Sequence, residues 1–166
     1  MATNIAEFER WRAEVLFTGR LIQDGDTSVD PDEAARRAHR YTELVDSAKG
    51  NWTEEVFQTL VESLQVDDDY GVYETTVGVI FSFPPEKFGG WLMKALPDLA
   101  RRQPEHAGDF LSLMVNNYQG SAPQYLVAFR EALRCAPATL RNELLAFIAQ
   151  QEREGWLQEK SGFYVA

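Results

Sequence analysis

Apolar residues recur with helical spacing along most of the chain. The clearest case lies in residues 54–64, where Val56, Leu60 and Leu64 follow one another at intervals of four. Such a stripe predicts an amphipathic helix that buries one face. Comparable stripes are Phe8, Trp11, Val15 and Ile22; Phe110, Leu113, Met114 and Tyr118; Tyr125, Leu126, Phe129 and Leu133; and Leu140, Leu144, Leu145 and Ile148. The pattern predicts an all-α protein of about seven to eight helices.

Capping residues and prolines mark the ends of these helices. Asp30 followed by Pro31 combines a capping acid with proline at the first helical position. Thr53 can cap the next helix, and Pro104 can begin another. A helix over 88–102 is expected to bend or restart near Pro97. Predicted breaks are Gly50, Pro84-Pro85, Gly120-Ser121, Ala136-Pro137 and Gly155.

Residues 70–82 carry two conflicting patterns. Tyr73, Val77 and Ile80 have helical spacing, whereas Val77 also begins an alternation with Val79, Phe81 and Phe83 that is typical of a strand. Several residues here are β-branched, which favours strand. No nearby segment offers a partner strand, so helix is the preferred prediction and strand the alternative.

The predicted organisation is a single helical domain over residues 1–166. It divides into N-terminal helices in 1–50, helix-pair repeats in 51–155 and a C-terminal tail in 156–166. Helices end just before Asp67, Pro104 and Pro137, at spacings of 37 and 33 residues. This period suggests a short HEAT-like α-solenoid, and an irregular helical bundle is the equal alternative.

Composition is that of a globular protein, with 45% hydrophobic and 25% charged residues among 166. No segment approaches the roughly 20 apolar residues of a membrane helix. The N-terminus lacks the basic and apolar regions of a signal peptide. Cys135 is the only cysteine, which excludes an internal disulfide. A cytoplasmic location is expected.

Negative charge is concentrated in one part of the chain. The formal net charge is −10, and no Lys or Arg lies between Lys49 and Lys87. This balance argues against direct binding to nucleic acid or to an anionic membrane, and it favours a basic protein partner. The acids of this segment are Glu54, Glu55, Glu62, Asp67, Asp68, Asp69, Glu74 and Glu86.

No catalytic group, metal site or cofactor is predicted. His39 and His106 lie in no metal-binding motif, with His39 expected on a solvated helix face and His106 in a first helical turn. Cys135 is expected near a helix C-terminus as a buried structural thiol, because the helix dipole there disfavours a thiolate.

The acidic turn over residues 24–30 superficially resembles a calcium loop. Val29 and Ala35 occupy the positions at which an EF-hand requires glycine and glutamate. The EF-hand pattern therefore fails, and a loose divalent-ion site stays open as an alternative.

Aromatic residues alternate with acids around residue 70, which is the candidate partner-binding site. Tyrosine and tryptophan dominate the energetics of protein interfaces, and charge supplies steering. The alternative is a solvated acidic helix face with its aromatics in the core. The predicted binding residues are Asp67, Asp68, Asp69, Tyr70, Tyr73, Glu74 and Trp91.

The stretch from Asp67 to Glu74, followed by an apolar helix and Phe83-Pro84-Pro85, resembles a known class of protein. It is similar to the small, acidic, all-helical immunity proteins of bacterial polymorphic toxin systems, such as contact-dependent inhibition and Rhs-type systems. The resemblance covers roughly residues 50–150 and transfers no site residue. It implies tight binding to a cognate toxin domain, often a basic nuclease, in bacterial competition.

Two other functions remain open at this point. The chain could be a helical-repeat adaptor or regulatory module without a toxin partner. It could also be an enzyme that uses unrecognised carboxylates or a metal ion.

Overall fold

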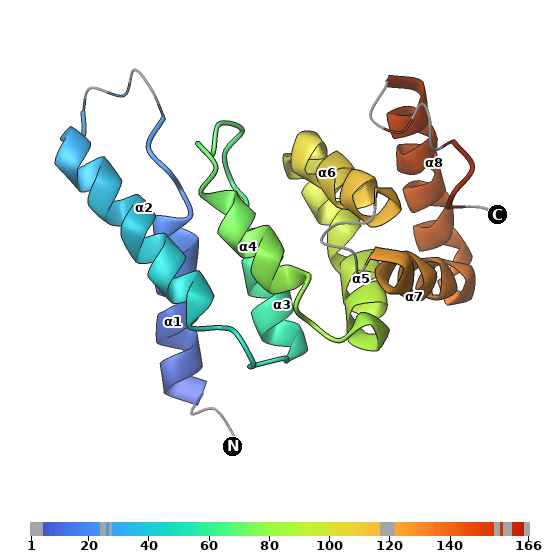
Figure 1. Cartoon of the computed structure of the whole chain (residues 1–166), viewed down its shortest axis with the longest axis horizontal. Coiled ribbons are helices and arrows are strands. Elements are labelled where there is room, and N and C mark those ends of the chain that lie inside the picture. The colour runs from blue at the N-terminus through green and yellow to red at the C-terminus, as the bar shows by residue number, and fades with distance from the viewer. Residues whose placement is uncertain are drawn as a thin grey trace. The chain divides into compact units, whose positions relative to one another are not determined.

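The computed structural model describes residues 5–23, 26, 28–116, 122–154, 157 and 161–164, and the regular secondary structure in this part of the chain is entirely helical (Figure 1). The all-α prediction is thereby confirmed. The eight helices are α1 (Ile5–Thr18), α2 (Pro31–Asp46), α3 (Glu54–Glu62), α4 (Tyr73–Ile80), α5 (Pro85–Arg102), α6 (Pro104–Val115), α7 (Ala122–Cys135) and α8 (Ala138–Glu154).

Local capping explains where several helices begin. The Asp30 carboxylate accepts a hydrogen bond from the backbone N–H of Asp32 at 2.7 Å, and the Thr53 hydroxyl accepts one from Val56 at 3.3 Å. Both caps satisfy amide groups that have no partner inside the helix. The predicted starts of α2 and α3 are therefore confirmed. Helix α5 begins at Pro85 and continues through Pro97, so no restart occurs there.

The chain folds into two compact units, Met1–Phe83 and Pro84–Ala166. Their boundary falls at the Pro84-Pro85 pair, not at residue 50 or 155 as in the predicted subdivision. The single domain and the HEAT-like repeat both stay predictions. No helix in the described part of the chain is long and apolar enough to cross a membrane.

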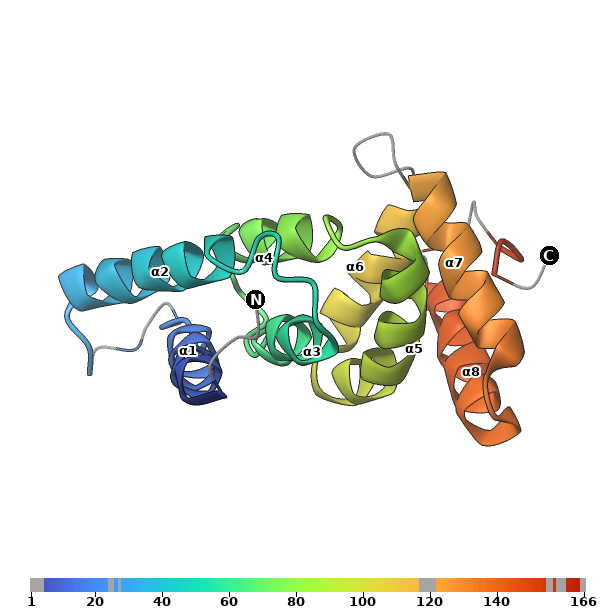
Figure 2. The ribbon, with the colours of Figure 1, turned by 90° about the horizontal axis from the view of Figure 1, so that it is seen from below.

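The first unit has two layers of helices. Helices α1 and α3 form one layer, and α2 and α4 form the other (Figure 2). Between them lies a set of buried hydroxyl groups. The Tyr41 hydroxyl is hydrogen-bonded to the hydroxyls of Ser63 at 2.7 Å and Thr76 at 2.6 Å. Burial raises the pKa of Tyr41, so this hydroxyl stays protonated and its bonds hold the layers together.

Helix α4 settles the conflict in residues 70–82 in favour of helix, although it begins only at Tyr73. Tyr73, Thr76, Val79 and Ile80 form one buried face, at helical intervals. The competing strand would place Thr76 and Val79 on opposite faces. Burial of this face against α2 and α3 therefore outweighs the β-branched composition.

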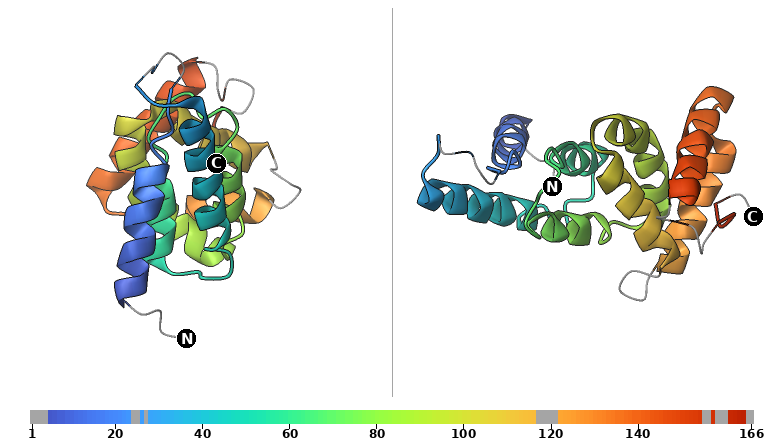
Figure 3. Two further views of the ribbon diagram at one scale, coloured as in Figure 1. Left: turned by 90° about the vertical axis from the view of Figure 1, so that its left-hand side faces the viewer. Right: turned by 90° about the horizontal axis from the view of Figure 1, so that it is seen from above.

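The second unit is organised around α5, which contacts α6, α7 and α8 (Figure 3). Phe88 of α5 is fully buried and packs edge-on against Tyr125 of α7, with ring centroids 4.8 Å apart. Gly89 lets the two helices approach closely, because a Cβ atom there would lie 2.4 Å from the backbone of Ala128. The contact between α5 and α7 is thus made by backbone as well as side chains.

Cys135 is exposed, which corrects the prediction of a buried thiol. Helix α7 buries Tyr125, Phe129 and Leu133, which recur every four residues. Cys135 lies two positions beyond Leu133, a rotation of about 200° around the helix that carries it to the solvent side. Tyr118, predicted to point inward from α6, lies outside the described residues, as do the breaks at Gly120-Ser121 and Gly155 and most of the tail.

Candidate functional site

The segment between α3 and α4 contains most of the predicted binding residues, and it is bonded to α1 and to the residues that follow α1. The Gln65 side chain donates to the Leu16 carbonyl at 2.8 Å and accepts from the Arg20 guanidinium at 2.9 Å. The Gln23 side chain donates to the Asp68 carbonyl at 3.0 Å. Two bonds of the Gln65 side chain and one to the Asp68 carbonyl thus tie this loop to a single neighbouring segment.

Asp69 shapes the turn that leads into α4. Its carboxylate accepts hydrogen bonds from the backbone N–H groups of Gly71 at 3.1 Å and Tyr73 at 3.0 Å. Tyr70 and Gly71, which directly follow Asp69, adopt the left-handed conformation, with φ of 51° and 77°. This backbone conformation is uncommon for tyrosine and persists only where the surroundings enforce it. It leaves the Tyr70 side chain 55% exposed.

Three acids around Tyr70 keep their charge uncompensated. Asp67, Asp68 and Glu74 are exposed, and none has an ion-pair partner among the described residues. Asp69 differs, because its carboxylate is occupied by the turn. We use the name acidic loop for Asp67, Asp68 and Tyr70 together with Glu74 in the first turn of α4. It combines unpaired negative charge with one exposed aromatic ring.

Tyr73 is buried, unlike the exposed residues of the acidic loop, and its role in binding a partner stays a prediction. Its side chain is only 2% exposed. Its hydroxyl donates to the Gly19 carbonyl at 2.6 Å and accepts from the backbone N–H of Gln65 at 3.0 Å. The residue belongs to the core because α4 turns its apolar face, which starts at Tyr73, toward α2 and α3.

Trp91 lies in the second unit, on α5, where it is half-buried. The Lys87 ammonium lies 5.6 Å from the centre of its ring, within the range of a cation–π interaction. The site that the first unit provides therefore consists of the acidic loop without Trp91.

A second acidic feature of the first unit is a groove between α1 and α3. Its volume is about 430 Å³, and four carboxylates line it together with a single guanidinium. That guanidinium, from Arg12, is bound to Glu62 at 2.9 Å. Sequence reasoning missed this groove because α1 contributes Glu9 and Arg12 from about 45 positions upstream. The lining residues are Phe8, Glu9, Arg12, Glu54, Glu55, Gln58, Thr59 and Glu62.

The net charge of the protein divides unequally between the two units. The first unit has 17 acidic and 7 basic residues, a net of −10, and the second is neutral with 9 of each. The whole net charge of the protein thus belongs to the unit that contains the acidic loop and the acidic groove.

The histidines and the acidic turn over residues 24–30 are the other features that the sequence singled out. No group of three or more metal-binding side chains occurs within the described ranges. His39 is exposed on α2 and lies 3.3 Å from Glu43, and His106 sits in the first turn of α6, as expected. The Asp26 carboxylate accepts hydrogen bonds from Ser28, which lower its pKa. Asp24, the first acid of this turn, lies outside the described residues.

Comparison with known proteins yields no significant match to any family model, curated protein or solved structure.

Proposed function

We propose that this protein is an immunity protein that binds a cognate toxin domain with a basic surface and blocks its activity. The observation that carries the proposal is the confinement of the net charge of −10 to the first unit, where a fixed loop exposes unpaired acids beside Tyr70. The sequence resemblance to acidic helical immunity proteins adds the class of partner.

In this proposal the acidic side chains set the association rate and the exposed tyrosine ring sets the dissociation rate. Unpaired surface acids attract a basic partner over about 10 Å and raise the association rate. An exposed tyrosine contributes contact area that slows dissociation. Because hydrogen bonds already fix the loop, little conformational entropy is lost on binding.

A nuclease toxin is the partner that this arrangement fits best. Its cleft is basic because it holds phosphates, and a protein surface rich in carboxylates can occupy the same cleft. Inhibition then results from exclusion of the nucleic acid, with no chemistry by the inhibitor. Neither a cofactor nor a metal ion has a role in this mechanism.

The first test is a pull-down from lysate of the source cells, with the full chain as bait at low and high salt. We expect a stoichiometric basic partner that salt releases. That partner expressed alone should arrest growth, and co-expression of the present chain should restore it. Capture of a partner without toxicity would favour the adaptor function instead.

Neutralising the acidic loop is expected to slow association with that partner. The triple variant Asp67→Asn/Asp68→Asn/Glu74→Gln should associate about tenfold more slowly at low ionic strength and show a weaker salt dependence, because the local field that steers the partner is removed. Stopped-flow mixing at several salt concentrations measures both quantities.

The matched control removes an equal number of negative charges, three, from the second unit. It is Glu105→Gln/Asp109→Asn/Glu154→Gln, which changes the net charge equally but leaves the first unit intact. We expect a much smaller change in association rate for this control. Equal slowing by the two variants would show that only total charge matters, and unchanged rates in both would exclude the acidic loop as the interface.

A further inference from the structure

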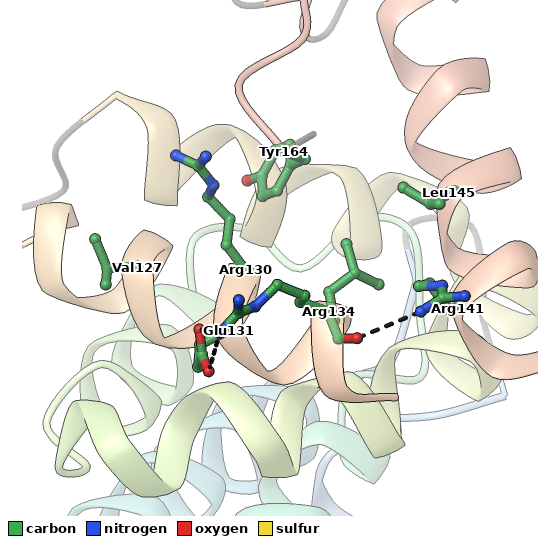
Figure 4. Close-up of a pocket in the computed structure, with 8 residues that line it drawn as sticks. Val127, Arg130, Glu131, Arg134, Arg141, Leu145 and Tyr164 are labelled. Atoms are coloured by element: carbon green, nitrogen blue, oxygen red, sulfur yellow. Dashed lines mark hydrogen bonds and ion pairs between the residues drawn. The ribbon is translucent and has the colours of Figure 1, made fainter. Parts of the chain in front are cut away.

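The second unit contains a pocket of about 480 Å³ that the proposed function does not use (Figure 4). It lies between α7, the start of α8 and the C-terminal turn of residues 161–164. Its lining combines apolar groups with three guanidinium groups, a combination different from the acidic groove of the first unit. The lining residues are Val127, Arg130, Glu131, Leu133, Arg134, Arg141, Leu145 and Tyr164.

Two of the three arginines lack a carboxylate partner. Arg134 donates to both oxygens of Glu131, at 2.7 and 2.8 Å, and this contact lowers the pKa of Glu131 and keeps it ionised. That pair is neutral overall. Arg130 and Arg141, both half-buried, form no ion pair with any described residue. The pocket therefore keeps two uncompensated positive charges, although the protein as a whole is strongly acidic.

The two unpaired guanidinium groups come from different helices. Arg130 projects from α7 on the side of Tyr164, and Arg141 extends from α8 to donate a hydrogen bond to the Arg134 carbonyl at 3.3 Å (Figure 4). That single bond occupies one of the five N–H donors of Arg141, and Arg130 donates to no residue in the described part of the chain. Both groups have donors left for a ligand.

The aromatic wall of the pocket is fixed in place. The buried Tyr164 hydroxyl donates to the Leu111 carbonyl, and its ring packs edge-on against Phe129 with centroids 5.8 Å apart. The turn that carries Tyr164 is held by Glu152, whose carboxylate accepts from the Gly162 amide at 2.7 Å. A site with rigid walls loses little entropy when it binds a ligand.

We propose that this pocket binds a small organic anion, with a carboxylate or phosphate group at the arginines and an apolar body between Leu133, Leu145 and Tyr164. Guanidinium groups match both oxyanions through paired N–H donors. The volume suits a ligand of ordinary small-molecule size. The inference is independent of the toxin partner, since it concerns the neutral second unit alone.

The test is binding of defined probes to the full chain, followed by NMR shifts of the Val127 and Leu145 methyl groups. Phenyl phosphate and benzoate distinguish the two anionic groups, benzyl alcohol lacks the charge, and inorganic phosphate lacks the apolar body. We expect at least one of the two aromatic anions to bind, and to bind about tenfold more tightly than benzyl alcohol and inorganic phosphate.

Two charge-removing variants locate the site. Arg130→Gln and Arg141→Gln should each weaken the aromatic anion about tenfold, because each removes charged hydrogen-bond donors. Arg153→Gln, on the exposed end of α8 and outside the pocket, should leave the affinity unchanged. Circular dichroism confirms that all three variants are folded.

Three results would overturn the proposal. They are failure of both aromatic anions to bind, equal binding of benzyl alcohol or inorganic phosphate, and equal affinity of the Arg130 and Arg141 variants and the wild-type protein. None of these results bears on the pull-down, so the two proposals fail or succeed separately.

Discussion

Replacement of Gly89 by alanine is expected to lower the free energy of unfolding by about 3 kcal/mol. The new Cβ atom would lie 2.4 Å from both the carbonyl carbon and the oxygen of Ala128, and 2.8 Å from the Phe129 nitrogen. These are backbone atoms of α7, so no side chain can rotate away to make room. Helices α5 and α7 must move apart, and the buried pair Phe88 and Tyr125 then loses contact.

Gly90 provides a control one position away. A Cβ atom there meets no atom within 4 Å, and the residue lies inside the same helix. Gly90→Ala is therefore expected to raise the free energy of unfolding by about 0.5–1 kcal/mol through helix propensity. Urea unfolding followed by circular dichroism measures both variants. Shifts of the same sign would contradict the close contact between α5 and α7.

This pair also shows what the sequence could and could not predict. The dipeptide Gly89-Gly90 indicates a turn or a close packing point, and the sequence does not distinguish the two glycines. The difference depends on which residue of α5 faces Ala128, and that is set by the packing of two helices about 40 residues apart. The residues around Gly89 therefore do not indicate which of the two glycines faces α7.

Helix starts were predictable where their cause is local. Asp30 and Thr53 cap the residues that immediately follow them, so their side-chain chemistry suffices. Residues 70–82 were ambiguous because their local propensity favours strand, and only the burial of Tyr73, Thr76 and Ile80 against other helices decides for helix. Of the bend or restart expected near Pro97, the restart does not occur, because α5 runs continuously from Pro85 to Arg102 with Pro97 on its buried face.

The candidate site was predictable in charge but not in detail. An excess of acids without nearby lysine or arginine is visible in the sequence, and it led to Asp67, Asp68 and Glu74. The contacts of Asp69 are local, with residues two and four positions later, but the sequence does not distinguish which of the three consecutive aspartates makes them. The acidic groove brings together α1 and α3. The arginine pocket brings together α7, α8 and Tyr164, although the spacing of Arg130 and Arg134 by four residues already indicates a shared helix face.

Replacement of Tyr73 by phenylalanine is expected to lower the free energy of unfolding by about 2 kcal/mol. The ring keeps its place beside Tyr41, so no cavity forms. The substitution removes two hydrogen bonds, one to the buried Gly19 carbonyl and one from the half-buried backbone N–H of Gln65. Chemical denaturation gives the difference directly.

Tyr70→Phe is the matched control, since its side chain is 55% exposed and water can replace its hydroxyl. We expect its free energy of unfolding to stay within about 0.5 kcal/mol of wild type. Binding should show the reverse order. Tyr70→Ala should dissociate faster from the basic partner, whereas Tyr73→Phe, when fully folded, should bind as the wild type does. Equal loss of binding by Tyr70→Ala and Tyr73→Phe would mean that binding depends on the conformation of the whole loop and not on direct contact with the Tyr70 ring.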